Sequence, residues 1–238
     1  MKMRRLSEID LARIGPLSGE EKLFRLRQLK FGRPPHTYNP LRKSVGDILN
    51  VQPEMFAGFG EYTPWGQIEG DITKRSTSES ELSFNLGVAK ALYNFGVSEG
   101  AVSYGKPIAE WVVGYGQAVK YWWNIYTVMR EEPYFVFVDP RLNSALNRPA
   151  IRFVLSVMNE RIRIPEPDFA DARLAVCQFP KGVDGERNVR LFDASEFELF
   201  DADQMNDMIG ETYRLWASVL AERDASERRR TGTTPFGF

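Results

Sequence analysis

The chain has 238 residues, of which 43% are hydrophobic and 26% charged, and its formal net charge is −1. This composition is typical of a globular protein with a substantial core. No apolar run approaches the roughly 18 to 20 residues that a membrane-spanning helix needs. The first residues are charged, with no apolar stretch behind them, so we expect neither a signal peptide nor a transit peptide and a cytoplasmic location.

Cysteine and histidine occur once each, as Cys177 and His36. A disulfide within the chain is therefore impossible, and a zinc site built from Cys and His ligands cannot be assembled. Cys177 lies in an apolar run and is expected in the core. A Ser-His-Asp triad would have to use His36, which we expect on a surface turn.

The N-terminal part of the chain is basic. Residues 1–50 carry eleven Lys and Arg against five acids, and capping signals predict two short helices before residue 32. In a helix-turn-helix interpretation, Lys22, Arg25 and Arg27 on the second helix would face the phosphates of a nucleic acid. The alternative is that this basic face packs on the protein's own acidic body.

Residues 32–78 are rich in Pro and Gly, which predicts little regular structure beyond a short helix from Lys43 to Asn50. We interpret this region as a wrapping segment or a linker. The predicted division of the chain is a basic helical and wrapping segment (1–75), a core domain (76–224) and a flexible tail (225–238).

The elements of the core follow from hydrophobic spacing and turn residues. Apolar residues at helical spacing predict a helix over residues 78–95. Residues 108–128 fit both helix and strand, and their β-branched and aromatic residues favour strands near 110–115 and 120–128. The remaining elements are a strand over 134–139, a helix over 147–162, strands over 173–179 and 188–192, and a helix starting after Asp201 or Asp203. The predicted fold is α+β, with a central mixed β-sheet flanked by helices.

The strand over 134–139 is followed by an acid, a proline and a base. Pro140 biases Asp139 toward an extended conformation, so the acid is held at the end of a buried strand. There it can cap the following turn or pair with Arg141, Arg148 or Arg152. This structural role stands beside two others, the binding of a metal or substrate and the contact with a partner.

From residue 78 onward the predicted order is helix, three strands, helix and strand. This order resembles the core of the restriction-endonuclease-like PD-(D/E)XK superfamily, whose members mostly cut nucleic acid with magnesium. The resemblance is topological and covers roughly half of the chain. It implies a site made of Glu81, Asn124, Asp139 and Arg141, with Asp139 as the magnesium ligand.

Two of these positions depart from the family's pattern. Asn124 stands where the family has an aspartate, and an amide is a weaker magnesium ligand than a carboxylate. Arg141 stands where the family has a lysine, and a guanidinium is too basic to assist a water molecule. The implied site is therefore degenerate, and magnesium is expected only if the core is catalytic.

These observations predict a nucleic-acid-binding protein with a nuclease-like core, active or inactive. Its phosphate contacts would come from Lys22, Arg25, Arg27, Arg152, Arg161 and Arg163. The alternative is a non-enzymatic adaptor or subunit that binds a protein partner through residues 32–78 or through the tail with Phe236 and Phe238. A hydrolase of small molecules is a third possibility, indicated only by the acids Asp168, Asp171, Asp193 and Glu196.

Overall fold

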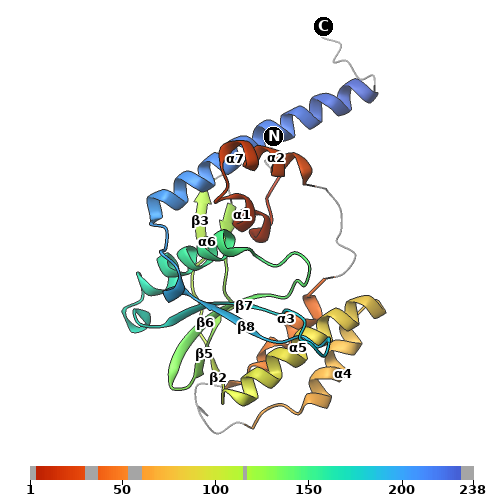
Figure 1. The fold of residues 1–238 in the computed structure, drawn as a ribbon, viewed down its shortest axis with the longest axis vertical. Coiled ribbons are helices and arrows are strands. Elements are labelled where there is room, and N and C mark those ends of the chain that lie inside the picture. The colour runs from red at the N-terminus through yellow and green to blue at the C-terminus, as the bar shows by residue number, and fades with distance from the viewer. Residues whose placement is uncertain (1–3, 30–36, 53–60, 115–116, 232–238) are drawn as a thin grey trace.

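The computed structural model describes residues 4–29, 37–52, 61–114 and 117–231 (Figure 1). Its centre is a six-stranded sheet with the order β1-β2-β5-β6-β7-β8. The strands are β1 (Val51–Gln52), β2 (Val102–Gly105), β5 (Ile125–Met129), β6 (Glu132–Asp139), β7 (Arg173–Gln178) and β8 (Arg190–Asp193). β1 and β6 pair in parallel with β2 and β7, and the other neighbours are antiparallel. The sheet is thus mixed, and the predicted fold class is confirmed.

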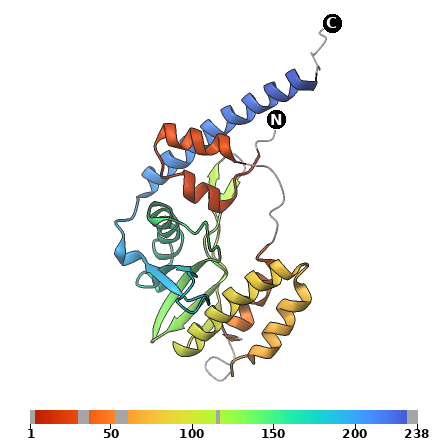
Figure 2. The ribbon, with the colours of Figure 1, turned by 45° about the vertical axis from the view of Figure 1, so that its right-hand side comes forward.

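Helices cover both faces of this sheet (Figures 1 and 2). One face carries α1 (Glu8–Ile14), α6 (Arg148–Met158) and α7 (Ala202–Thr231), with α2 (Gly19–Gln28) lying against α7. The other face carries α3 (Asn39–Ile48), α4 (Trp65–Arg75) and α5 (Glu79–Ser98). A separate two-stranded ribbon consists of β3 (Trp111–Gly114) and β4 (Gln117–Val119).

The two strands at the centre, β6 and β7, are buried on both faces. Phe135 and Val176 belong to the core beneath α1, α6 and α7, whereas Val138 and Cys177 belong to the core beneath α3, α4 and α5. Successive residues of a strand point to opposite faces, so a strand between two cores needs a continuous apolar run. This requirement explains the apolar sequence from Tyr134 to Val138 and the burial of Cys177 that the sequence predicts.

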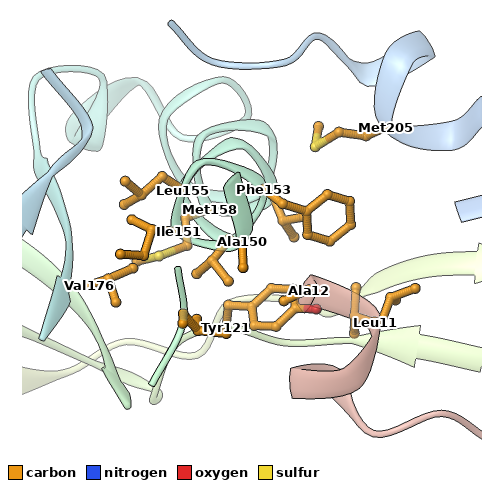
Figure 3. Packing of buried hydrophobic residues seen from close by; sticks show 14 of the residues in the cluster. Leu11, Ala12, Tyr121, Ala150, Ile151, Phe153, Leu155, Met158, Val176 and Met205 are labelled. Atoms are coloured by element: carbon orange, nitrogen blue, oxygen red, sulfur yellow. The ribbon is translucent and has the colours of Figure 1, made fainter. Parts of the chain in front are cut away.

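Tyr121 connects the larger core to the N-terminal helices. Its ring is fully buried and stands edge-on to Phe153, with ring centroids 6.3 Å apart. Its hydroxyl donates a hydrogen bond of 2.6 Å to the carbonyl of Glu8. Figure 3 shows Tyr121 among side chains of α1, α6 and α7, including Leu11 and Met205.

Strands are confirmed for most of the ambiguous region, with two differences. The predicted strand over 120–128 begins only at Ile125, because Tyr121 and Trp122 turn into the core instead of continuing a ladder. After α5, the first strand of the main sheet is β2 (Val102–Gly105), which the sequence did not predict. The strand predicted near 110–115 corresponds to β3, which belongs to the separate ribbon. The order helix, three strands, helix, strand is therefore present, but with a different first strand.

The prediction for residues 32–78 was wrong in extent. Two helices are present among the described residues of this segment, α3 and α4, instead of the short helix from Lys43 to Asn50. Pro40 lies in the first turn of α3 and Pro64 is the N-cap of α4, where the missing N–H of proline costs no hydrogen bond. The prolines thus mark the starts of helices. His36 lies outside the described residues.

Two helices end differently from their predictions. After Met158, α6 continues as one π-helical turn from Asn159 to Arg163, in which the N–H of Ile164 bonds to the carbonyl of Asn159 at 3.2 Å. α7 extends to Thr231, past the predicted start of a tail at residue 225. Its last turns consist mainly of Ala, Glu and Arg, which favour helix, and they project away from the sheet (Figures 1 and 2). The boundary near residue 75 stays a prediction.

The basic N-terminal helices pack on the body of the protein. The Lys22 side chain is fully buried and forms an ion pair with Glu211 of α7. Arg27 pairs with Glu222, with 2.8 Å between Nη2 and Oε1. Arg223 donates in return to backbone carbonyls of α2 and its C-cap, at Leu26, Arg27 and Leu29. Within the described ranges, no helix is long and apolar enough to cross a membrane.

The Lys22–Glu211 pair yields a stability prediction. Glu211→Ala should lower the free energy of unfolding by about 3 kcal/mol, because it leaves a buried ammonium without a counter-charge. The double variant Lys22→Met/Glu211→Ala should recover most of this loss. Urea denaturation followed by circular dichroism measures both.

Arg27→Ala is the matched control, because both partners of the Arg27–Glu222 pair are about half exposed. Its effect should be clearly smaller than that of Glu211→Ala, because water screens an exposed ion pair. Equal losses for Glu211→Ala and Arg27→Ala would contradict the assignment of Lys22 as a buried charge.

Candidate functional site

The residues after β6 form a loop that is anchored by Asp139; we call residues 140–147 the Asp139 loop. Asp139 is fully buried, and its Oδ1 accepts a hydrogen bond of 2.7 Å from Nε of Arg141. Its Oδ2 accepts one of 2.7 Å from the N–H of Leu146 at the far end of the loop. Gln178 at the end of β7 donates to the carbonyl of Leu146 at 2.7 Å. A single carboxylate and one amide therefore close the loop.

Two more arginines approach this loop from other parts of the chain. Arg187, in the connection between β7 and β8, donates from Nη1 to the carbonyls of Pro140 at 3.2 Å and of Phe179 at 3.0 Å. Arg13 of α1 interacts electrostatically with Arg141 and Asp139. Burial, and next the neighbouring Arg141 guanidinium, lower the pKa of Arg13.

Tyr38, the N-cap residue of α3, also interacts with these groups. Its hydroxyl forms a hydrogen bond with Arg187 and interacts electrostatically with Arg141 and Asp139. Burial raises the pKa of Tyr38, and the Arg187 guanidinium offsets part of that rise. We call Arg13, Arg141 and Arg187 the arginine cluster. Its members come from α1, from the Asp139 loop and from the β7–β8 connection.

The Asp139 loop borders three hollows of the surface. Ser144 and Asn147 line one of about 400 Å³ together with residues of α1 and α2. Leu142 and Asn143 line one of about 1040 Å³ together with α4, α5 and the β7–β8 connection. Pro140 lines a third, of about 260 Å³. The loop follows the carboxyl end of β6, beside the end of parallel β7, and this is where α/β sheets commonly bind ligands.

Glu81 lies elsewhere, in the first turn of α5. Its two carboxylate oxygens accept hydrogen bonds from the N–H and the hydroxyl of Thr37 and from the same two groups of Thr77, at 2.7 to 3.0 Å. These bonds, led by the one from the Thr77 N–H, lower the pKa of Glu81 to about 2. Glu81 therefore ties the start of α3 to the start of α5.

Asn124 is exposed at the start of β5. Its side chain accepts a hydrogen bond from Lys120, and its backbone carbonyl accepts one of 2.8 Å from the N–H of Lys106. The four residues of the implied catalytic site are thus held by three separate sets of hydrogen bonds. The structure brings together Asp139 and Arg141, but neither Glu81 nor Asn124 shares their contacts.

This arrangement does not fit a magnesium ion. Both oxygens of Asp139 already accept hydrogen bonds from Arg141 and Leu146. Throughout the part of the chain that the structure describes, no three His, Cys, Asp or Glu side chains are grouped as metal ligands would be. Oxygen ligands from several groups are what magnesium requires, and here a guanidinium occupies the position next to the acid.

The predicted phosphate-binding residues are dispersed. Lys22 and Arg27 pair with α7, and Arg25 is exposed at the hollow between α1 and α2. The others contact the protein itself: Arg152 stacks on Phe200 at 3.7 Å, Arg161 donates to Ala109 at 3.3 Å and Arg163 donates to Ala172 at 2.7 Å. Each of these three arginines therefore contacts a group of the same chain.

The acids behind the hydrolase alternative have structural roles or face solvent. Asp193 pairs with Arg173 at 2.8 Å and caps a short 3-10 helix (Ala194–Glu196), and Glu196 accepts from the N–H of Asp193. Asp168 and Asp171 are exposed. Cys177 is buried as expected, and burial raises the pKa of its thiol, which disfavours the reactive thiolate.

Sequence reasoning missed three residues of the site: Arg13, Arg187 and Tyr38. Each lies more than forty residues from Asp139 along the chain, in segments expected to be a short helix, a turn and a linker. Their residue types carry no local signal, since single arginines and tyrosines are common on surfaces. Only the packing of α1, α3 and the β7–β8 connection around the Asp139 loop brings them together.

Comparisons with known proteins give a consistent result. The family model described as "Sliding clamp-binding bacterial toxin SocB" matches residues 9–226. The "DNA replication inhibitor toxin SocB" of Caulobacter vibrioides is 35% identical over 233 residues, covering 98% of this chain and 97% of the relative. No solved structure matches.

These matches overturn the resemblance to PD-(D/E)XK nucleases and, with it, the prediction of a nuclease-like nucleic-acid-binding protein that uses magnesium. The physical reason for the error is that the order of helices and strands is shared by many α+β domains and does not place side chains. The alternative prediction, an adaptor that binds a protein partner, agrees better with the matches.

Asp139 should be essential for folding. Asp139→Ala should lower the free energy of unfolding by about 3 to 5 kcal/mol, because it leaves the Arg141 guanidinium without its acceptor and the Leu146 N–H unpaired. Chemical denaturation measures this change. Asp168→Ala, the same substitution at an exposed acid, should change it by no more than about 0.5 kcal/mol. A loss below about 1 kcal/mol for Asp139→Ala would rule out the anchoring role.

Glu81 should make stability depend on pH. Its pKa is about 2 in the folded protein against an ordinary value of 4.5, so its stabilising effect is present above pH 4.5 and is lost as the pH falls toward 2. Glu81→Gln should therefore lower the Tm at pH 7, and the difference from the wild type should shrink between pH 4.5 and 3. Differential scanning calorimetry at a series of pH values tests this. A difference that is independent of pH would show that the charge of Glu81 is not involved.

Proposed function

The chain belongs to the family of sliding clamp-binding bacterial toxins, and we propose that it binds the sliding clamp of the bacterial replication machinery and thereby inhibits DNA replication. The observation that carries this proposal is the extent of the match, which covers nearly the whole of both chains. A match of this extent includes both cores and every layer of the fold. An inhibitor of replication acts where the chromosome is, so a cytoplasmic location is part of the proposal.

Two features of the structure support a protein partner. Lys22 and Arg27 on α2 and Arg163 on α6's extension are engaged with groups of the same chain, which leaves them less suited to phosphates. The Asp139 loop joins an acid to arginines instead of offering a set of metal ligands. A binding protein needs neither a free basic stripe nor a catalytic metal.

The adaptor alternative predicts the partner surface in residues 32–78 or in the tail, and we extend the first of these to the hollow that this segment lines together with α5. Much of this segment is described, although residues 32–36 and 53–60 and the tail 232–238 lie outside the described residues. α4 from this segment lines the hollow of about 1040 Å³, which we call the α4–α5 groove. Its lining combines Trp65, Phe84 and Leu142 with charged side chains such as Lys90 and Arg187. Aromatic residues within a polar rim are typical of protein interfaces.

Clamp binding can be measured directly. The purified chain should bind purified sliding clamp from Caulobacter vibrioides in biolayer interferometry, and its expression in that bacterium should reduce the incorporation of labelled thymidine into DNA. Absence of binding at micromolar concentrations of both proteins would refute the proposal.

The surface can be located with substitutions that leave the core intact. Ser83→Arg and Asn94→Arg place long side chains at exposed positions of the α4–α5 groove and should weaken clamp binding by tenfold or more, about 1.4 kcal/mol, at an unchanged Tm. Val112→Arg is the control, since Val112 is 73% exposed on β3, outside the groove. Phe236→Ala/Phe238→Ala tests the tail. Loss of binding only in the tail variant would place the contact there.

A further inference from the structure

The arginine cluster leaves buried donors unused. Within the described part of the chain, Nη2 of Arg13, Nη2 of Arg141 and Nη2 of Arg187 are all inaccessible to solvent and have no hydrogen-bond partner in the protein. A buried donor without an acceptor is costly, and more so when it is charged. Native structures rarely keep such groups, and a bound ion or ordered water usually accounts for them. The three donors belong to α1, the Asp139 loop and the β7–β8 connection, which meet beside Asp139.

The charges at this place are unbalanced. Three guanidinium groups face two acids, Asp139 and Asp10, which both interact electrostatically with Arg13. Both oxygens of Asp139 already accept hydrogen bonds, and Oδ2 of Asp10 accepts a hydrogen bond of 2.6 Å from Ser7. These three guanidinium groups thus outnumber the two acids that interact with Arg13, and the acids have little capacity left for further donors. An additional negative group would complete the set.

The three arginines are held in fixed positions by their other contacts. Arg141 is fixed by Asp139, and Arg187 is fixed by the carbonyls of Pro140 and Phe179 and by the hydroxyl of Tyr38. The stem of Arg187 also lies against α5, where its Cγ would be 3.3 Å from a Cβ added at Gly87. Because these side chains are already ordered, binding an anion would cost little conformational entropy.

We propose that the arginine cluster binds a phosphate-type oxyanion beside the Asp139 loop. A carboxylate is planar and is satisfied by one guanidinium, whereas donors arriving from three elements suit a group with several oxygens in different directions. The position agrees with this proposal, because the loop follows the carboxyl end of β6 next to parallel β7, where α/β sheets commonly bind ligands.

The oxyanion can be inorganic phosphate or the phosphoryl group of a nucleotide. Arg13 lines the hollow of about 400 Å³ beside the loop, and Arg187 lines the α4–α5 groove of about 1040 Å³. The α4–α5 groove has room for the organic part of a nucleotide. In either case the anion would bridge α1, the Asp139 loop and the β7–β8 connection. Its binding would therefore raise the stability of the folded chain.

The test uses the purified full chain without any clamp, so its outcome is independent of the proposed function. Sodium phosphate should raise the Tm by about 3 to 6 °C at ten times its dissociation constant, relative to sodium chloride at equal ionic strength. Isothermal titration calorimetry with inorganic phosphate and with ADP distinguishes the sources. Tighter binding of ADP assigns a nucleotide phosphoryl group, and equal or weaker binding of ADP assigns the free anion.

Variants locate the site. Arg13→Gln and Arg187→Gln should each weaken phosphate binding at least tenfold, and Arg141→Gln should do the same if it folds without the full Asp139 pair. Arg130→Gln is the matched control, because Arg130 is exposed at the opposite end of the sheet, paired with Glu99, and should bind phosphate as the wild type does. A Tm that responds equally to phosphate and chloride, or phosphate binding unchanged in both Arg13→Gln and Arg187→Gln, would overturn the proposal and assign the unused donors to water.

Discussion

The burial of β6 and β7 on both faces is the constraint on which the rest of the structure depends. Phe135 and Val176 face one core and Val138 and Cys177 face the other, so the pair is stable only when helices cover both sides. The N-terminal segment supplies α1 to one side and α3 and α4 to the other. The segment that looked like an appendage in the sequence is thus part of both cores, and it brings Arg13 and Tyr38 to the end of the central strands.

The Asp139 loop shows how this burial creates a polar site. Where β6 ends, the chain must leave a region that is closed on both faces, and Asp139 satisfies the donors of the loop from inside. A buried carboxylate needs a counter-charge, and Arg141 provides it. Arg187 adds hydrogen bonds to the backbone around the same turn. The arginine cluster beside this loop is the site at which we propose that an oxyanion binds.

The same logic separates this protein from the nucleases that its element order resembles. A nuclease core places several oxygen ligands around a metal, whereas here Glu81 holds the junction of α3 and α5, and Asp139 holds a loop. The basic helix α2 is bound to α7 through Lys22 and Arg27. Among the described residues, the α4–α5 groove is one of several accessible hollows, and it is the one in which we propose that a protein partner binds.

The sequence by itself determined the mixed α+β architecture, the central strand ending at Asp139, the helix from Asn147 and the burial of Cys177. These features depend on local properties: the hydrophobic period, the capping residues, and the Gly and Pro residues at which elements end. The sequence left open whether Asp139 caps the following turn or pairs with Arg141, Arg148 or Arg152, and the structure shows the pair with Arg141. Only the tertiary structure decided that Pro40 and Pro64 begin helices, that Tyr121 turns inward, and that Glu81 lies apart from Asp139. Contacts between distant segments, such as those of Arg13 and Arg187 with the loop, depend on how two cores close around one strand pair, and no local pattern encodes that.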